Sequence, residues 1–462
     1  MAPGERLGPR ARPAAAIALA VLLTVAAAAR GESPAPPEPA SEGPTLAELG
    51  IKGRATFKNF SHFYETPNDD RKFRNEGILE VEWGRRLLPW SRVKVVVDIR
   101  EDDDSLTRGV TLQVPEKNER RSVLNLKEAV AGFQQGAVEV TLGKQIFAWG
   151  TADAYNPTDN INPYDYLDVI DNEKLGVYSA AARLTVVPAS LTVVVIPFFT
   201  PSRIPLLRSR WVPPPPEGVI AIVDNRQLPP RDVDNMQYAA RLKTTFGGVD
   251  LSASYYEGFE PTPVIRRSAV RPAPDLAPDL VLPRFTPVFT RMKVAGLDVS
   301  TTYGKFEVHG EGAFKFVEQN GRDDRVQWIA GLNYTWDDLD LKWLEQVTAI
   351  AEYARETVLS SDPRSPIIGG AESPGALLNN AFRNALAGRL LFKFSEETQL
   401  KLSGTIDFSQ SANHYLQLKL AHKFTDALHA ETGLDLFTGA PETFWGRWRD
   451  NDRFFFFLRY FF

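Results

Sequence analysis

Apolar and polar residues alternate along most of the chain. In residues 305–316 the rings of Phe306 and Phe314 share one parity, and charged side chains occupy the other; residues 326–336 and 400–408 repeat the pattern. A period of two residues is typical of a β-strand with one apolar and one polar face. These segments run for about ten residues, the length that a tilted strand needs to cross a bilayer. The pattern therefore predicts an all-β protein whose strands could span a membrane.

The links between the predicted strands alternate in length. Short, turn-like links fall at residues 87–91, 134–136, 187–190, 247–248, 304–305, 337–339, 395–397 and 425–427. Between them lie mostly long, polar or proline-rich links at residues 64–75, 101–122, 147–175, 197–235, 258–290, 317–325, 357–380, 409–413 and 438–450. In outer-membrane barrels, short turns occupy one side of the membrane and long loops the other. The alternation predicts a single closed antiparallel transmembrane β-barrel of about 18 strands, with 16 as the alternative count, over residues 53–462.

Aromatic residues gather beside the short links. They are Trp83, Trp90, Phe246, Tyr303, Phe306, Trp336, Trp343, Phe394 and Phe424. Rings that cluster at one end of the strands are expected at a lipid–water interface. Their placement supports a membrane barrel independently of the strand pattern.

Both ends of the chain carry further signals. Residues 1–29 combine a basic start, an apolar stretch and small residues, which predicts a signal peptide for Sec-type export. Residues 30–52 are rich in proline and are predicted to be a disordered lead. Near the C-terminus, one strand face carries Phe454, Phe456, Leu458, Tyr460 and Phe462.

The terminal phenylalanine after alternating aromatics resembles the insertion signal of Gram-negative outer-membrane barrels. This resemblance implies that the barrel-assembly machinery is a partner, through Phe462. It also implies that outer-membrane lipid and lipopolysaccharide surround the protein. We therefore expect the protein to lie in the outer membrane.

Composition excludes several classes of protein. The chain has no cysteine, which excludes disulfides and thiolate metal sites. Its 53 basic and 58 acidic residues give a net charge of −5, so no basic excess favours nucleic acid as a partner. The five histidines fall in predicted strands or at their ends, and His414 and His422 are too far apart along one strand to form a metal pair. We expect neither an enzyme nor a cofactor or metal site.

The most distinctive segment is a strand end followed by a loop. Residues 142–150 read LGKQIFAWG, and residues 156–163 read NPTDNINP. This combination resembles a poorly characterised group of porin-like outer-membrane proteins, distant relatives of the phosphate-selective and alginate-export porins. The resemblance implies a β-barrel channel and carries over no solute. In that group the loop is expected near or inside the pore, which corresponds here to residues 147–175.

This loop is strongly acidic. The residues assigned to a channel constriction are Trp149, Asp153, Asp159, Asp165, Asp168 and Asp171. In a constriction, the carboxylates would face cations or polar solutes. A second interpretation is a loop stabilised by calcium, although the EF-hand spacing is absent. A third is an acidic loop on the outer surface.

Strand parity predicts which basic residues line the pore wall. They are Arg183, Arg241, Lys243, Arg383, Arg389, Lys393 and Lys401. Acidic residues of the same parity balance them, which does not favour a dedicated phosphate pore. The last four lie on adjacent predicted strands. Two interpretations therefore stay open: a basic ladder opposite the acidic loop, or ordinary charge pairing across a wide lumen.

The function that these features favour is passive diffusion of small polar solutes or ions through a porin-like outer-membrane channel. One alternative is a structural or interaction barrel, either a sealed sleeve or a protein that binds through its surface loops. Another is a transporter of hydrophobic compounds, although the lead is too short for a plug domain. The oligomeric state, monomer or trimer, stays open.

Overall fold

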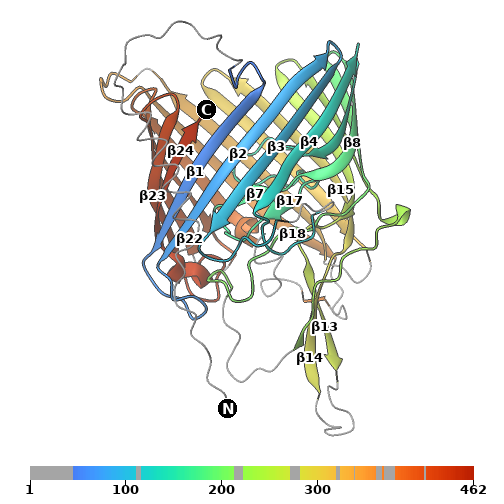
Figure 1. Ribbon diagram of the computed structural model, residues 1–462, viewed down its shortest axis with the longest axis vertical. Helices are drawn as coiled ribbons and strands as arrows, with labels where there is room; N and C mark the ends of the chain where they lie inside the picture. The colour runs from blue at the N-terminus through green and yellow to red at the C-terminus, as the bar shows by residue number, and fades with distance from the viewer. Residues whose placement is uncertain are drawn as a thin grey trace, which may run out of the picture.

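Strand pairing runs without a break around a closed antiparallel barrel of 18 strands (Figure 1). The computed structural model describes residues 45–110, 116–212, 222–270, 281–318, 323–337, 339–360, 367–368, 380–409 and 413–462. The first strand of the barrel pairs with the second and also with the last, which closes the cylinder. The predicted closed antiparallel barrel of about 18 strands is therefore confirmed.

The strands of the barrel follow one another in chain order. They are β1 (Ile51–His62), β2 (Phe73–Leu88), β3 (Ser91–Asp102), β4 (Leu124–Gln135), β5 (Val138–Gln145), β8 (Val177–Val186), β9 (Ala189–Ile196), β11 (Gln237–Phe246), β12 (Val249–Phe259), β15 (Arg291–Tyr303), β16 (Phe306–Val317), β17 (Asp324–Trp336), β18 (Gln346–Ser360), β20 (Asn384–Lys393), β21 (Thr398–Asp407), β22 (Asn413–Lys423), β23 (Leu428–Thr438) and β24 (Arg453–Phe461).

Short turns and long loops lie at opposite ends of the barrel (Figure 1). The tightest turns use glycine at positive φ, at Gly247 (60°) and Gly304 (61°), a conformation that a side chain would strain. The link predicted at residues 337–339 is longer in the structure, because β18 begins only at Gln346. The preceding residues run along the rim, where Trp343 stacks on Phe394 with ring centroids 6.2 Å apart. Their alternating pattern imitates a strand, which is why the sequence suggested a shorter turn.

The two faces of each strand differ in polarity. On β15, Leu297 and Val299 point outward and are 67% and 40% exposed, whereas Met292 and Asp298 on the other parity are buried. β24 shows the same division, with Phe454 outside and Arg453 inside. An apolar exterior and a polar interior invert the usual arrangement of a water-soluble fold.

Smaller elements occupy the end with the long loops. β10 (Ile222–Val223), β13 (Val264–Val270), β14 (Leu282–Val288) and β19 (Ile367–Ile368) form a separate sheet, whose β13–β14 hairpin projects beyond the barrel (Figure 1). β6 (Tyr164–Asp165) pairs with β7 (Glu173–Lys174). The described residues also form the short 3-10 helices η1 (Val233–Asn235), η3 (Asn380–Phe382) and η4 (Gly446–Asn451).

The N-terminal predictions fall mostly outside the described residues. The signal peptide predicted at 1–29 is among the residues not described, as is most of the lead predicted at 30–52. Residues 45–50 form a turn and Ile51 already begins β1, so the last part of that lead belongs to the fold. Within the described ranges, no helix has the length and apolar character needed to cross a membrane.

Candidate functional site in the barrel lumen

The link between β5 and β8 enters the barrel. Residues 146–176, here called the lumen loop, contact inward-facing side chains on strands all around the wall. The turn into the lumen requires Gly150, whose φ is +98°. A Cβ at this position would lie 2.5 Å from the carboxylate of Glu311. Here a bulkier residue would push the loop off the wall.

The second Asn-Pro pair of the sequence motif closes the base of the lumen loop. Asn162 is 2% exposed. Its Oδ1 accepts from the backbone N–H of Phe147 at 2.7 Å, and its Nδ2 donates to the carbonyl oxygens of Gln145 and Leu175. One amide side chain therefore ties the two ends of the loop together. This explains why the motif carries asparagine there.

The returning half of the lumen loop, residues 163–175, is here called the anchored arm. Each of its four acidic side chains meets a cation from elsewhere in the chain. The pairs are Asp165 with Arg121 (2.9 Å) and Arg203 (2.8 Å), Asp168 with Arg453, Asp171 with Lys58 (2.6 Å), and Glu173 with Arg100 (2.6 Å) and Lys127 (2.9 Å). These cations belong mainly to β24, β1, β3 and β4, which lie within a run of five neighbouring strands in the order β24, β1, β2, β3, β4.

Burial and charge act in opposite directions on the acidic side chains of the anchored arm. Burial by itself raises the pKa of Asp168, but the guanidinium of Arg453 outweighs it and holds the pKa well below its usual range. The pKa of Glu173 is lowered in the same way, because Arg100 and Lys127 outweigh its burial. Both carboxyls are therefore anionic at neutral pH and act as fixed anchors.

The first half of the lumen loop, which leaves β5, contains residues 151–158, here called the loop tip. In the loop tip the acceptors belong to the wall and the donors to the loop. Wall carboxylates accept hydrogen bonds from its backbone N–H groups. Glu311 accepts from Thr151 at 2.8 Å, and the two oxygens of Glu352 accept from Asp153 and Ala154 at 2.7 Å each. The backbone N–H groups of the loop tip thus donate to carboxyl oxygens of the wall.

The loop tip spans the lumen. Asp153 Oδ1 accepts from Arg389 Nη1 on β20 at 2.9 Å. In the 18-strand barrel, β20 is the ninth strand from β5 in either direction, so it lies opposite the strand from which the loop departs. The lumen loop therefore divides the interior of the barrel.

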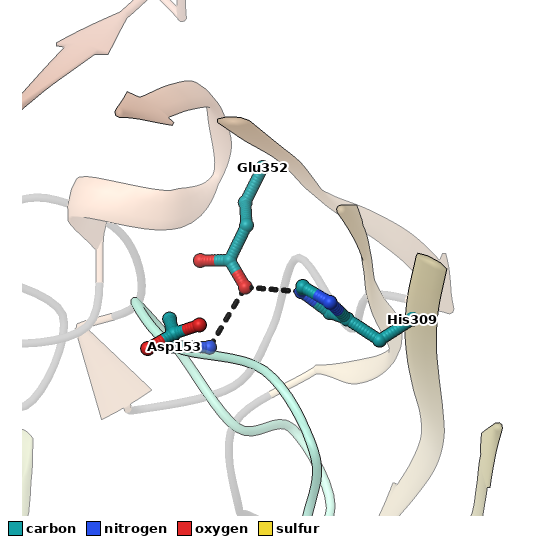
Figure 2. A group of neighbouring side chains, drawn as sticks. All are labelled: Asp153, His309 and Glu352. Carbon is teal, nitrogen blue, oxygen red and sulfur yellow. Dashed lines mark hydrogen bonds and ion pairs between the residues drawn. The ribbon is translucent and has the colours of Figure 1, made fainter. Parts of the chain in front are cut away.

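Asp153, His309 and Glu352 form a compact group at this contact (Figure 2). Each could offer one ligand atom to a metal ion, with these atoms within 4.8 Å of one another. However, Glu352 Oε1 is 2.6 Å from His309 Nε2, both oxygens of Glu352 accept loop N–H groups, and Asp153 is paired with Arg389. The geometry is that of a hydrogen-bonded latch between wall and loop tip.

Two predicted constriction residues lie at the root of the lumen loop. Trp149 is 7% exposed, packs in an apolar cluster with residues such as Val194 and Met292, and has the Arg241 guanidinium 5.9 Å from its ring. Asp159 pairs with Lys174, and burial nevertheless raises its pKa. Trp149 thus packs the start of the lumen loop against the barrel wall.

The predicted basic wall is dispersed and mostly paired. Its ion pairs are Arg183 with Glu139 (3.9 Å), Arg241 with Asp298 (3.2 Å), Lys243 with Asp250 (3.6 Å), Arg383 with Glu356 (3.9 Å), Arg389 with Asp153 (2.9 Å) and Lys393 with Glu345 (3.4 Å). Lys401 makes no ion pair with any residue in the described part of the chain. Most of these pairs join side chains on or beside neighbouring strands, and the Arg389 pair reaches the lumen loop, so the paired basic residues are neutralised locally and do not form a continuous ladder.

A cavity of about 540 Å³ separates the lumen loop from the wall formed by β15, β16, β18 and β20–β22. Of the predicted site residues, Asp153, Asp159 and Arg389 line it. Asp165, Asp168 and Asp171 do not, because their carboxylates are directed to the cations that hold the anchored arm, whose Tyr164 and Tyr166 do line the cavity. The structure therefore divides the predicted aspartates into two groups.

Sequence reasoning missed several residues that hold the lumen loop. The most important are His309, Glu352, Arg121 and Arg453. Glu352 shares the inward parity of β18 with Ala354 and Glu356, whereas Arg355 lies on the outward parity. This alternation was the signal in the sequence that could have identified Glu352.

No protein-family model matches the sequence, and no curated protein sequence matches it. The resemblance of the LGKQIFAWG and NPTDNINP segments to a sequence group therefore has no counterpart in these comparisons.

Solved structures resemble the chain at low identity. Wzi of Escherichia coli, an outer-membrane protein involved in group 1 capsule assembly and described as a carbohydrate-binding β-barrel, is 10% identical with a TM-score of 0.49, over 98% of this chain and 89% of Wzi. A BenF-like porin from Pseudomonas fluorescens Pf-5 is 8% identical with a TM-score of 0.48, over 89% and 97%. OmpF of Salmonella typhi is 8% identical with a TM-score of 0.41, also over 89% and 97%. At these identities the likeness concerns the barrel fold alone.

Proposed function

We propose that the protein is an outer-membrane channel for passive diffusion of small polar solutes or ions. The membrane location is supported by the exterior of the barrel. At the turn end, Phe246, Tyr303 and Trp343 are 79%, 84% and 62% exposed, and apolar side chains cover the strand faces beyond them. Such a surface would associate in water, whereas lipid would cover it.

The single observation that carries the channel proposal is the cavity in the lumen. A barrel of 18 strands encloses more space than its own side chains fill. The lumen loop occupies part of this space, and the cavity of about 540 Å³ between loop and wall is lined by polar as well as aromatic side chains. Polar solutes that cross the barrel would pass through this gap.

Within this proposal the constriction residues take different roles. Asp153 and Asp159 line the gap and set its electrostatic character, together with Arg389 on the facing wall. Asp165, Asp168 and Asp171 anchor the loop through buried or half-buried ion pairs. Trp149 supports the loop at its root.

Planar-bilayer recording of the purified, folded protein tests the proposal. We expect stable conductance steps. The double variant Asp153→Ala/Arg389→Ala removes both partners of the pair that crosses the gap, so its conductance should rise. Lys305→Ala/Asp337→Ala removes an exposed pair at the turn end and serves as the matched control, with unchanged conductance.

A sealed sleeve is the second candidate, favoured by the loop contact between opposite walls. A barrel that is well folded, shows heat-modifiable migration and yet remains electrically silent would support the sleeve. Silence in the double variant as well would exclude the gap as a passage.

A further inference from the structure

The charged side chains that line the lumen cavity are already paired. Asp153 pairs with Arg389, Asp159 with Lys174, Glu260 with Arg325 and Glu352 with His309, and Lys315 also has an interaction partner. An ion that entered the cavity would have to compete with these protein partners. The lining therefore offers little unpaired charge to a charged ligand.

Several neutral hydrogen-bonding groups in the same lining have no partner in the described part of the chain. Within the described ranges, the hydroxyls of Tyr164, Tyr166, Thr262, Ser403 and Thr405 make no side-chain hydrogen bond. Gln417 donates through its Nε2 to Tyr415 and Asp435, which leaves its Oε1 as a free acceptor. Hydroxyl groups can both donate and accept, so they suit a ligand that does the same.

Burial keeps the two tyrosine hydroxyls in their donor form. It raises the pKa of Tyr164 and of Tyr166, and the nearby Asp159 charge raises both further. Their protons are therefore retained at any physiological pH. Each can donate a hydrogen bond to a neutral ligand oxygen.

Aromatic rings line the cavity in three stacked pairs. Tyr155 stacks on Phe382 with centroids 5.1 Å apart, Tyr164 on Tyr166 at 5.3 Å, and Tyr415 on Trp445 at 5.1 Å. The pairs come from the lumen loop, from η3, from β22 and from the link between β23 and β24. They approach the cavity from several sides, so a flat apolar face could rest against a ring.

We propose that this cavity is a binding site for an uncharged saccharide. A sugar ring has apolar C–H faces for the aromatic rings and a rim of hydroxyls for the neutral donors and acceptors. The cavity volume, about 540 Å³, lies within the range typical of small-molecule sites. The inference rests on the proposed function, since it names the solute class for the same lumen, but binding does not require conduction.

Isothermal titration of the folded protein in detergent tests the proposal without a channel assay. The probes are glucose, maltose, xylose and N-acetylglucosamine, with sodium benzoate as an aromatic anion. At least one saccharide should bind saturably, and benzoate should bind more weakly. Binding by none of the saccharides, or preferential binding of benzoate, would overturn the proposal.

Matched variants locate the binding. Tyr164→Ser removes a ring of the lining and should weaken saccharide binding about tenfold, and Ser403→Ala should weaken it less. Tyr303→Ser removes a ring that is 84% exposed at the turn end and serves as the control. Equal affinity in the wild type and in both lining variants would contradict the assignment. If the barrel conducts ions but binds no saccharide, the proposed channel function stands and the saccharide site is wrong. If the barrel binds saccharide but does not conduct, the saccharide site stands and the channel function is wrong.

Discussion

The two halves of the lumen loop are attached to the barrel by opposite arrangements of charge. In the anchored arm the loop supplies carboxylates and the rest of the chain supplies cations, as in Asp168 with Arg453. At the loop tip the wall supplies carboxylates, Glu311 and Glu352, and the loop supplies neutral backbone N–H groups. The arm is thus fixed by buried and half-buried ion pairs, whereas the tip is fixed by hydrogen bonds to two wall carboxylates and by one more exposed ion pair, Asp153 with Arg389.

This difference has consequences for stability. Breaking a buried ion pair by removing one partner leaves an uncompensated charge, which costs more than losing one hydrogen bond. The anchored arm should therefore behave as part of the barrel, and the tip as the more easily released half. Changes at the tip should alter the passage before they alter the fold.

The largest effect is expected at Arg453. This side chain is 1% exposed and lies between Asp168 and Asp435, the latter at 2.7 Å. Arg453→Met leaves two buried carboxylates without their cation and should lower the free energy of unfolding by about 3–5 kcal/mol. Urea titration followed by tryptophan fluorescence measures the loss.

Arg449→Met is the control, because Arg449 is 51% exposed and 4.0 Å from Asp450. This variant should lower the free energy of unfolding by only about 0–1 kcal/mol. Equal losses in the two variants would remove the special role of the anchored arm.

A smaller effect is expected at Glu352. In Glu352→Gln the new amide N–H faces a backbone N–H of the loop, so the latch loses a hydrogen bond at a cost of about 1–3 kcal/mol. The loop tip should then leave the wall intermittently, and single-channel recordings should show additional current fluctuations. Glu307→Gln, on the inward parity of β16 and bonded only to Asn333 among the described side chains, should leave the current unchanged. A quiet Glu352→Gln channel would mean that the latch does not hold the tip.

The variant Asp153→Asn should lose less stability than Glu352→Gln. Its main effect should be on the ion preference of the channel. The pair of Asp153 with Arg389 leaves both side chains about one-third exposed, 33% and 34%, so Asp153→Asn should cost only about 0–1 kcal/mol. Arg389, which then has no anionic partner in Asp153, faces the gap and should stabilise each anion there by about 1 kcal/mol. The reversal potential should therefore shift toward anions. Asp165→Asn is the contrasting variant, since Asp165 is fully buried away from the gap; it should lose stability with a smaller shift in reversal potential. The reverse ranking would place the constriction in the anchored arm.

The smallest expected effect is the pH dependence of the stability that Asp168 contributes. The pKa of Asp168 is lowered in the folded protein, so its contribution to stability is fully present above the unfolded pKa of about 3.9 and is lost as pH falls through the folded value. The difference in urea midpoint between the wild type and Asp168→Asn should therefore stay constant from about pH 8 to pH 5 and shrink only below about pH 4. A difference that shrinks already near pH 6 would show that the Arg453 pair does not hold this carboxyl ionised.

Much of the barrel could be predicted from the sequence. The alternation at segments such as 305–316 and the alternating link lengths gave an antiparallel closed sheet of about 18 strands, because the side-chain period of a strand is independent of what it packs against. The link predicted at 337–339 was too short because Leu341 and Trp343 alternate like a strand while lying on the rim. Local pattern alone cannot distinguish the two.

The sequence by itself also singled out the loop after Trp149 and its five aspartates. What it could not supply was the partner of each aspartate, because Asp168 and Arg453 are 285 positions apart and Asp153 and Arg389 are 236 apart. Barrel closure and the inward course of the loop bring these groups together. Tertiary structure alone therefore decided which carboxylates anchor the loop and which face the cavity, since pairing of charges depends on distance in space and not on their spacing along the chain.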